Sequence, residues 1–197
     1  MLYTQDYQPE AMDYYTEPAW ASELLAGRER FMGLVYDPAC GSGNICKTFA
    51  ARGHEVLGTD LAEDRPYGQG GVDFLDESWW PSFIDNIVCN PPYGGAKVAE
   101  EFCRKALLLA KNKVCMFLPV AYLASSGRHD FFTNPLTQPQ RILVLSNRPS
   151  CPPGAKLEVG DIKQAGGKTD YMWVVWTTKH ATKPTEIHWL SKDNKNA

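Results

Sequence analysis

The sequence lacks the features of membrane, secreted and zinc-binding proteins. No apolar run approaches the roughly 20 residues needed to span a bilayer. The N-terminus, Met1 to Asp6, has no basic start followed by an apolar stretch, so no signal peptide is expected. The six cysteines form no C-x-x-C pair and the four histidines are scattered, so we expect reduced thiols and no metal. A cytoplasmic protein without a membrane partner is expected.

An overall excess of positive charge is also absent, because the net charge is −3. The charges are nevertheless unevenly distributed. Residues 1–96 carry 5 Lys and Arg against 15 Asp and Glu, whereas residues 97–197 carry 15 against 8. A basic face in the second half would suit nucleic acid. Solvated helix faces and the polar tail 190–197 would produce the same difference, so charge alone leaves both interpretations open.

Short apolar stretches alternate with helical patterns, which predicts one α/β domain over residues 1–197, with helices on both faces of a sheet. Strands are expected at 34–36, 55–59, 84–89, 114–120, 141–146 and 171–178, and residues 72–75 are expected at a further strand or its exit. Helices are expected at 18–27, 44–52, 97–111 and 125–132. Residues 147–170 are expected to form a long loop, a feature that is often functional in a compact domain. A disordered surface excursion is the alternative.

The first motif, Asp37-Pro-Ala-Cys-Gly-Ser-Gly-Asn44, lies between an expected strand and an expected helix. Gly41 and Gly43 allow the backbone to turn tightly and to approach a ligand without a Cβ clash. In doubly wound proteins, ligands bind at this end of the strands. The motif therefore predicts a binding loop.

The type of ligand is indicated by three nearby side chains. Cys46 stands where a dinucleotide-binding fingerprint requires Gly or Ala, which argues against a pyrophosphate. Asp37 would repel phosphates and attract a cationic amino-acid moiety, such as that of S-adenosylmethionine. Asp60 ends the next strand, where its carboxylate could accept hydrogen bonds from both ribose hydroxyls.

The second motif, Asn90-Pro91-Pro92-Tyr93, directly follows a strand. The Asn90 side-chain oxygen and the Pro91 carbonyl could each accept one N–H of an exocyclic amine, which would localise the nitrogen lone pair. Asn is neutral, so it would position the amine rather than abstract a proton. The prolines stiffen the turn, and Tyr93 offers a ring for an extruded base. The alternative is a plain Asn-Pro turn.

Together the two motifs resemble the amino-group-methylating branch of the Rossmann-like methyltransferases. The closest similarity is to adenine-N6 DNA methyltransferases of phages and restriction systems, with the loop before the tetrad as in the gamma arrangement. The resemblance implies a mostly parallel seven-stranded sheet with one antiparallel strand, S-adenosyl-L-methionine as cofactor, and a bacterial or phage-infected cell. It also implies DNA methylation at N6 of adenine, with Asn90, Pro91, Pro92 and Tyr93 as catalytic residues.

Three further segments fit this resemblance. Residues 15–20 resemble the N-terminal cofactor-binding element, although Glu17 separates a Thr and a Pro that are usually adjacent. Asp60 matches the ribose-binding acid. Residues 73–75 resemble the D-F-L element, whose acid contacts the cofactor's adenine, and Asp76 competes for that role. The cofactor-binding residues implied are Tyr15, Thr16, Asp37, Pro38, Ala39, Cys40, Gly41, Gly43, Asn44, Asp60, Leu61, Asp73, Phe74 and Asn90.

No separate target-recognition domain fits into the roughly 20 residues after the last expected strand. Selectivity would then come from loops, from a specificity partner or from a second copy of the chain. The candidates for target binding are Arg128, Phe131, Phe132, Arg148, Lys156, Lys163 and Lys168, with the basic residues on phosphates. The two phenylalanines could instead pack into the core.

Two alternatives remain open at this point. Similar tetrads occur in enzymes that methylate exocyclic amines of RNA or the glutamine side chains of release factors. A module that binds a cofactor or nucleic acid without catalysis is the alternative from another class.

Overall fold

The computed structural model describes residues 14–76, 78, 83–93, 96–160, 167–178 and 184–193. Within these residues, seven strands form one sheet in the order β2-β1-β3-β4-β6-β5-β7. They are β1 (Val35–Asp37), β2 (Val56–Gly58), β3 (Asn86–Cys89), β4 (Lys113–Pro119), β5 (Arg141–Leu145), β6 (Tyr171–Thr177) and β7 (Glu186–Leu190). Only β6 runs antiparallel to its neighbours β4 and β5. The expectation of a mostly parallel sheet with one antiparallel strand is confirmed.

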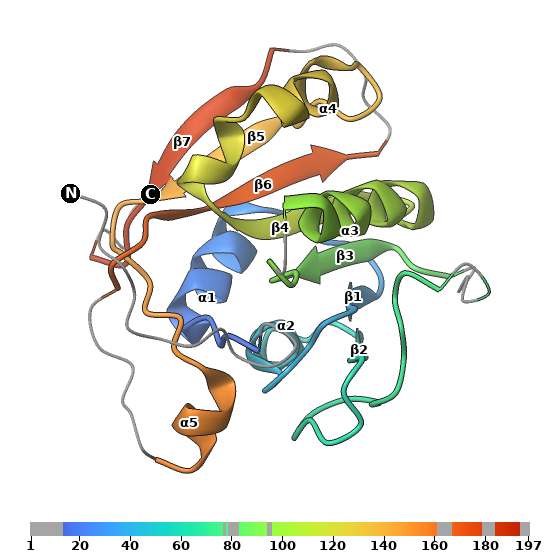
Figure 1. Cartoon of the computed structure of the whole chain (residues 1–197), viewed down its shortest axis with the longest axis vertical. Helices are drawn as coiled ribbons and strands as arrows, with labels where there is room; N and C mark the ends of the chain where they lie inside the picture. The colour runs from blue at the N-terminus through green and yellow to red at the C-terminus, as the bar shows by residue number, and fades with distance from the viewer. Residues whose placement is uncertain are drawn as a thin grey trace.

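Helices cover both faces of this sheet (Figure 1). The helices are α1 (Ala19–Arg28), α2 (Asn44–Ala51), α3 (Ala96–Leu109), α4 (His129–Thr133) and α5 (Gly154–Glu158), with 3-10 turns η2 (Val120–Leu123) and η3 (Ser126–Arg128). Strand β4 shows how the layers form. Its Met116 packs in the core beside α3, and its Phe117 packs in the core beside α1 and α2. A strand that is buried on both faces reads as a continuous apolar run.

The structure differs from the predicted strands in two segments, residues 72–75 and β7. Of the two alternatives for residues 72–75, the strand is wrong, because this segment is a turn in which the Asp73 carboxylate accepts a hydrogen bond from the Leu75 amide at 2.8 Å. Such an Asx turn competes with strand pairing. A strand that the sequence did not predict is β7, which pairs in parallel with β5 and buries Leu190. Its exposed Glu186, Ile187 and Trp189 conceal the alternation that predicts a strand.

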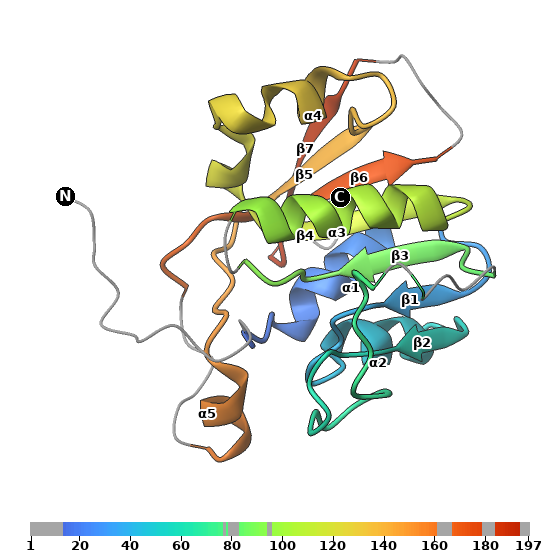
Figure 2. The same cartoon turned by 45° about the vertical axis from the view of Figure 1, so that its right-hand side comes forward.

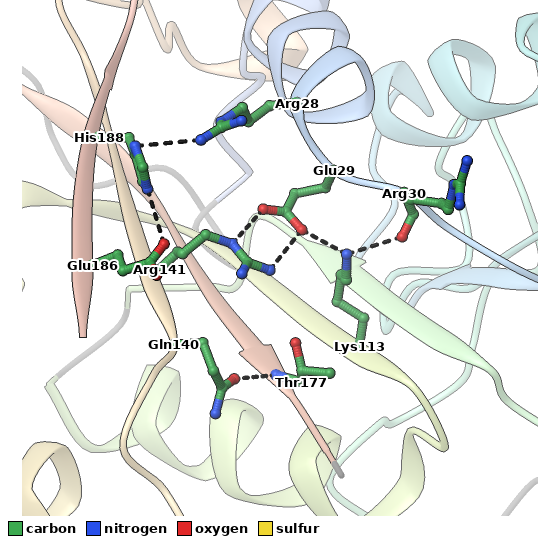
Figure 3. Close-up of polar contacts among 9 residues, drawn as sticks. All are labelled: Arg28, Glu29, Arg30, Lys113, Gln140, Arg141, Thr177, Glu186 and His188. Carbon is green, nitrogen blue, oxygen red and sulfur yellow. Dashed lines mark hydrogen bonds and ion pairs between the residues drawn. The ribbon is translucent and has the colours of Figure 1, made fainter. Parts of the chain in front are cut away.

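A buried ion cluster fastens α1 to the amino ends of two strands (Figure 3). Glu29, which follows α1 and is 8% exposed, accepts hydrogen bonds from Arg141 at 2.6 and 2.8 Å and from Lys113 at 2.6 Å. Lys113 also donates to the Arg30 carbonyl at 2.9 Å. Burial alone would raise the pKa of Glu29, but its hydrogen bonds to Arg141 and Lys113 outweigh burial and lower it. The cluster therefore holds Glu29 in its charged form.

We expect Glu29→Gln to lower the free energy of unfolding by about 3–5 kcal/mol, because it leaves two cations without their counter-charge. In the wild type, the pKa of Glu29 is lower when the chain is folded. Its contribution is therefore complete above the ordinary value of 4.5 and is lost as the pH falls through the folded-state value. Urea unfolding between pH 3 and 7 measures both effects, with exposed Glu63→Gln as control. Equal stability of wild type and Glu29→Gln at pH 7 would contradict this role.

Candidate active site

A cavity of about 320 Å³ opens at the carboxyl ends of β1, β2 and β3. Figure 2 shows the loops that follow these strands at one end of the sheet, on the same side of the picture as α5. The cavity is lined by Tyr14, Tyr15, Thr16, Glu17, Pro38, Ala39, Cys40, Gly41, Ser42, Asp60, Leu61, Arg65, Val72, Asp73, Phe74, Leu75, Asn90, Pro92, Val98 and Phe102. Its size and position suit a small-molecule site at the switch point of a doubly wound sheet.

The loop between β1 and α2 requires glycine at two positions. Gly41 and Gly43 have φ angles of 48° and 79°, in the left-handed region that side chains disfavour. A Cβ at Gly41 would lie 2.7 Å from the ring of Tyr14, and one at Gly43 would lie 2.3 Å from the ring of Tyr67. The expectation of a tight turn is confirmed, and the close neighbours of the two glycines are aromatic rings of the chain itself.

Asp60 is held in place at the end of β2. Its carboxylate accepts hydrogen bonds from the amides of Gly41 at 2.9 Å and Ala62 at 3.0 Å. The Nε atom of Arg65 lies 3.6 Å from the same carboxylate, and the Arg65 guanidinium lies 3.8 Å from the centre of the Tyr14 ring. Two fixed donors and one cation thus orient a carboxylate that borders the cavity.

Asp37, where the loop between β1 and α2 begins, is not among the residues that line the cavity. It is 1% exposed at the end of β1, and its carboxylate accepts a hydrogen bond from the Ala39 amide at 3.2 Å. Burial raises its pKa well above the ordinary value, and the neighbouring Glu17 adds to the rise. A cation in the cavity would favour the charged form of both acids.

The tetrad places Asn90 at the wall of the cavity, with its carboxamide held at both ends. The Asn90 Nδ2 donates to the Tyr15 carbonyl and to the Glu17 carboxylate, each at 3.0 Å. The Tyr93 hydroxyl lies 2.7 Å from the Asn90 Oδ1 and 2.7 Å from the Phe117 carbonyl oxygen. Pro92 also lines the cavity, whereas Pro91 and Tyr93 do not.

Tyr93 lies in a position that favours support of Asn90 over stacking on a base. Its hydroxyl is engaged by Asn90 and Phe117, and its partly buried ring packs against the core beside α3. In this arrangement the ring does not border the cavity. The stacking role expected from the sequence therefore has no support from the geometry.

Glu17 is the functional candidate that the sequence left without a role. It interrupts the usual Thr-Pro pair, is 7% exposed and lines the cavity beside Asn90. Burial raises its pKa to about 7, against the opposing effect of the hydrogen bond from Asn90. The inserted acid in the Thr-Pro element was the only signal. For Tyr14 and Arg65 the sequence carried no such signal. Both line the cavity because they contact each other across distant parts of the chain, and neither belongs to a short sequence motif.

The structure brings most of the expected cofactor-binding residues to one cavity. Those at the cavity are Tyr15, Thr16, Pro38, Ala39, Cys40, Gly41, Asp60, Leu61, Asp73, Phe74 and Asn90. Gly43 and Asn44 lie at the start of α2 outside the lining, where the Asn44 side chain donates to the Glu17 carbonyl at 2.7 Å. Phe74 is 1% exposed and packs on the rings of Tyr36 and Phe102.

The candidates near α4 are corrected by their burial. Phe131 is 1% exposed and packs near the ring of Trp176 and the guanidinium of Arg104, so it does not reach a target base. Phe132 packs against the core beside Tyr122. Both belong to the apolar side of a short amphipathic helix, which a sequence pattern of only 5 residues does not separate from an exposed aromatic pair. Arg128 is half-buried, and its Nε donates to the Tyr122 carbonyl at 2.8 Å.

Part of the expected loop 147–170 is folded onto the cavity wall. Thr16 donates from its amide to the Pro152 carbonyl at 3.1 Å, Gly154 donates to the Tyr14 carbonyl at 2.8 Å, and Tyr15 and Pro153 form an antiparallel bridge. The segment also contains α5, whose Glu158 accepts a hydrogen bond from the Tyr14 hydroxyl. The described part of this segment is therefore a structural element of the site.

The remaining basic candidates lie on the surface in the described part of the same segment. Arg148 pairs with Asp170 at 2.7 Å, and Lys156 and Lys168 are exposed. Lys163 lies outside the described residues.

Neither a membrane span nor a metal cluster is found in the part of the chain that the structure describes. No helix there is long and apolar enough to cross a membrane, and no three His, Cys, Asp or Glu side chains are grouped to hold a metal ion.

Two similar structures belong to restriction systems. A modification subunit of a type I restriction enzyme from Vibrio vulnificus is 14% identical, with a TM-score of 0.58, and the match covers 90% of this chain and 46% of that one. A type I restriction-modification methyltransferase subunit from Streptococcus thermophilus is 13% identical, with a TM-score of 0.56 and coverages of 90% and 47%. The chain thus spans about half the length of these proteins.

A third similar structure comes from a protein with a different description. It is described as a hemolysin from Lactococcus lactis, is 9% identical with a TM-score of 0.52, and is covered over 94% of its length. No protein-family model and no curated protein matches the sequence. The sheet topology and these likenesses establish the Rossmann-like fold of the S-adenosylmethionine-dependent methyltransferases.

Proposed function

We propose that this chain transfers a methyl group from S-adenosylmethionine to the N6 amino group of adenine in DNA. The observation that carries the proposal is the setting of Asn90. Its carboxamide is fixed at the wall of a cavity that is also bordered by the acids Glu17 and Asp60. A hydrogen-bond acceptor beside a site for a cationic cofactor is the arrangement that methylation of a planar amine requires.

The residues of the cavity fit the cofactor. Asp60 is oriented to accept hydrogen bonds from ribose hydroxyls, and Asp73 is exposed at the cavity for an adenine amino group. Phe74 supplies an apolar wall for the same ring. Glu17, with Asp37 behind it, would attract the cationic end. When bound, the cofactor supplies a methyl group on a positively charged sulfur.

The tetrad would act by positioning the acceptor. The Asn90 Oδ1 keeps a lone pair beside its contact with Tyr93, so it can accept one N–H. The Pro91 carbonyl remains the proposed acceptor of the other, although Pro91 does not line the cavity. This pulls the lone pair of the amine out of conjugation and toward the methyl group. The nitrogen forms the new N–C bond, the electrons of the broken C–S bond stay on sulfur, and the nitrogen releases one proton to solvent.

DNA is proposed as the substrate on three grounds. The motifs resemble those of DNA adenine methyltransferases, the second half of the chain is basic, and two similar structures are subunits of restriction enzymes. Arg128, Arg148, Lys156 and Lys168 remain the proposed phosphate contacts. A specificity partner or a second copy of the chain is proposed to supply the remaining recognition.

Transfer of labelled methyl groups tests the proposed function directly. The protein is incubated with labelled S-adenosylmethionine and with DNA, RNA and protein pools, and the products are identified by nucleoside and peptide mass analysis. We expect N6-methyladenine in DNA. If the label appeared in RNA amines or in glutamine side chains and not in DNA, RNA or protein would be the substrate in place of DNA. Protein that binds the cofactor but transfers nothing to any pool would contradict catalysis and favour a binding module.

A further inference from the structure

The carboxamide of Asn90 raises a problem of orientation. Its oxygen and nitrogen ends are nearly the same size, but only the oxygen can accept an N–H from an amine. If the Asn90 nitrogen faced the amine that is to be methylated, two N–H donors would oppose each other and no hydrogen bond could form. The site therefore needs neighbours that hold the nitrogen end away from the acceptor amine.

Tyr93 does not decide this orientation by itself. Its hydroxyl contacts both the Asn90 carboxamide and the Phe117 carbonyl, but it has one proton. The Phe117 carbonyl can only accept. When Tyr93 donates to Asn90, it favours the oxygen end of the carboxamide. When it donates to Phe117, its lone pairs favour the nitrogen end, so Tyr93 allows either orientation.

Glu17, when ionised, and the Tyr15 carbonyl decide it together, because both can only accept. A carboxylate only accepts, so it selects the nitrogen end of Asn90, which donates to it at 3.0 Å. The Tyr15 carbonyl takes the second N–H of the same nitrogen at 3.0 Å. A protonated Glu17 could donate instead, and the preference would weaken. We propose that Glu17 is a positioning residue for methyl transfer, whose carboxylate turns the Asn90 oxygen toward the acceptor amine.

The surroundings of Glu17 make its charge adjustable within the physiological range. Burial raises its pKa to about 7. The titratable groups that influence it or share its cavity are Asp37, Cys40, Cys46, Cys89, Tyr93, Cys151, Tyr14, Tyr15, Asp60, Arg65 and Asp73. A bound cationic cofactor would add a positive charge and favour the carboxylate. Binding of the cofactor would therefore set the orientation of Asn90 before the acceptor enters.

The inference rests on the proposed function, and kinetics test it in that setting. We expect Glu17→Met to lower kcat about 10- to 100-fold, as for a misplaced catalytic group. KM for the cofactor should rise to the same extent in Glu17→Met and Glu17→Gln, because both remove the charge proposed to attract the cationic end. Glu17→Gln, whose oxygen can still accept from Asn90, should retain most of kcat but lose the rise of kcat/KM through about pH 7. The double variant Glu17→Met/Asn90→Ala should be no slower than Asn90→Ala. Additive losses, or an unchanged kcat in Glu17→Met, would overturn the proposal.

A structural role alone would give a different result. Folding raises the pKa of Glu17, so its charge opposes folding as the pH rises through about 7. Both variants should thus be at least as stable as the wild type at pH 8 in thermal unfolding. A loss of kcat that matches a loss of folded protein would also count against the proposal.

Side-chain NMR tests the contact without any methyl transfer. In protein labelled with ¹⁵N asparagine, the Asn90 amide signals are assigned by their absence in Asn90→Ala. We expect them to shift through about pH 7 in the wild type and to stay unchanged in Glu17→Gln. Wild-type signals that do not respond between pH 5.5 and 8.5 would contradict the inference about Glu17. Missing transfer to every substrate would instead contradict the proposed function.

Discussion

Replacing Asn90 by alanine is expected to lower the rate of methyl transfer by about 100-fold or more, while leaving cofactor affinity within a few-fold of wild type. The substitution removes the oxygen that would accept an N–H of the acceptor amine. It also leaves the Glu17 carboxylate and the Tyr15 carbonyl without the donor that they share in the wild type. Single-turnover transfer to DNA and calorimetric binding of the cofactor measure the two quantities separately.

Asn112→Ala is the matched control for this experiment. Asn112 lies next to Lys113, at the amino end of β4, and its side chain makes an exposed contact of 3.4 Å with the Met32 carbonyl. It should retain wild-type transfer. Transfer by Asn90→Ala at the wild-type rate would refute the catalytic assignment. Loss of cofactor binding in proportion to the loss of transfer would assign Asn90 to binding instead.

Replacing Asp60 by alanine is expected to weaken cofactor binding by about 100-fold or more. Each hydrogen bond to a charged group contributes about 1.5–3 kcal/mol, and two ribose hydroxyls would lose this acceptor. The same carboxylate accepts hydrogen bonds from the backbone amides of Gly41 and Ala62, so its removal also loosens the loop between β1 and α2. Calorimetric titration with S-adenosylmethionine measures the change.

Asp64→Ala controls for the loss of one negative charge near the cavity. The Asp64 side chain is 88% exposed and lies 3.9 Å from Arg65. Its removal should change cofactor affinity by less than about threefold, as for an exposed ion pair. Equal effects of Asp60→Ala and Asp64→Ala would show that net charge rather than ribose contact governs binding.

The parts of the fold that sequence predicted best are those fixed by local rules. The strand that ends at Asp37 is predictable because it is buried on both faces and therefore apolar. The turn before the helix that begins at Asn44 is predictable because its positive φ angles require glycine. Two segments were harder to predict from the sequence. In residues 72–75 the Asp73 carboxylate accepts a hydrogen bond from the backbone amide of Leu75, and at one edge of the sheet β7 exposes most of its side chains. Neither effect produces the alternation that indicates a strand.

The candidate site divides in the same way. Asp60 and Asn90 are recognisable because each follows directly on a strand, and parallel strands end at one edge of a sheet. Tyr14 and Arg65 join the cavity through contacts between distant segments. The sequence leaves two alternatives for Phe131, because an aromatic pair in a short helix can face solvent or core, and its packing beside Trp176 and other distant residues decides for the core.

The pairing of Tyr15 with Pro153 has a consequence for the order in which the site is completed. A ribosome makes the glycine loop and the tetrad well before it makes residues 152–158, which support the wall formed by Tyr14 to Thr16. The ion pair of Glu29 likewise cannot form until Arg141 has been synthesised, 112 residues later in the chain. Contacts of such high sequence separation form late and cost the most loop-closure entropy. A nascent chain would thus carry both motifs before its binding cavity closes, so cofactor capture would coincide with the end of folding.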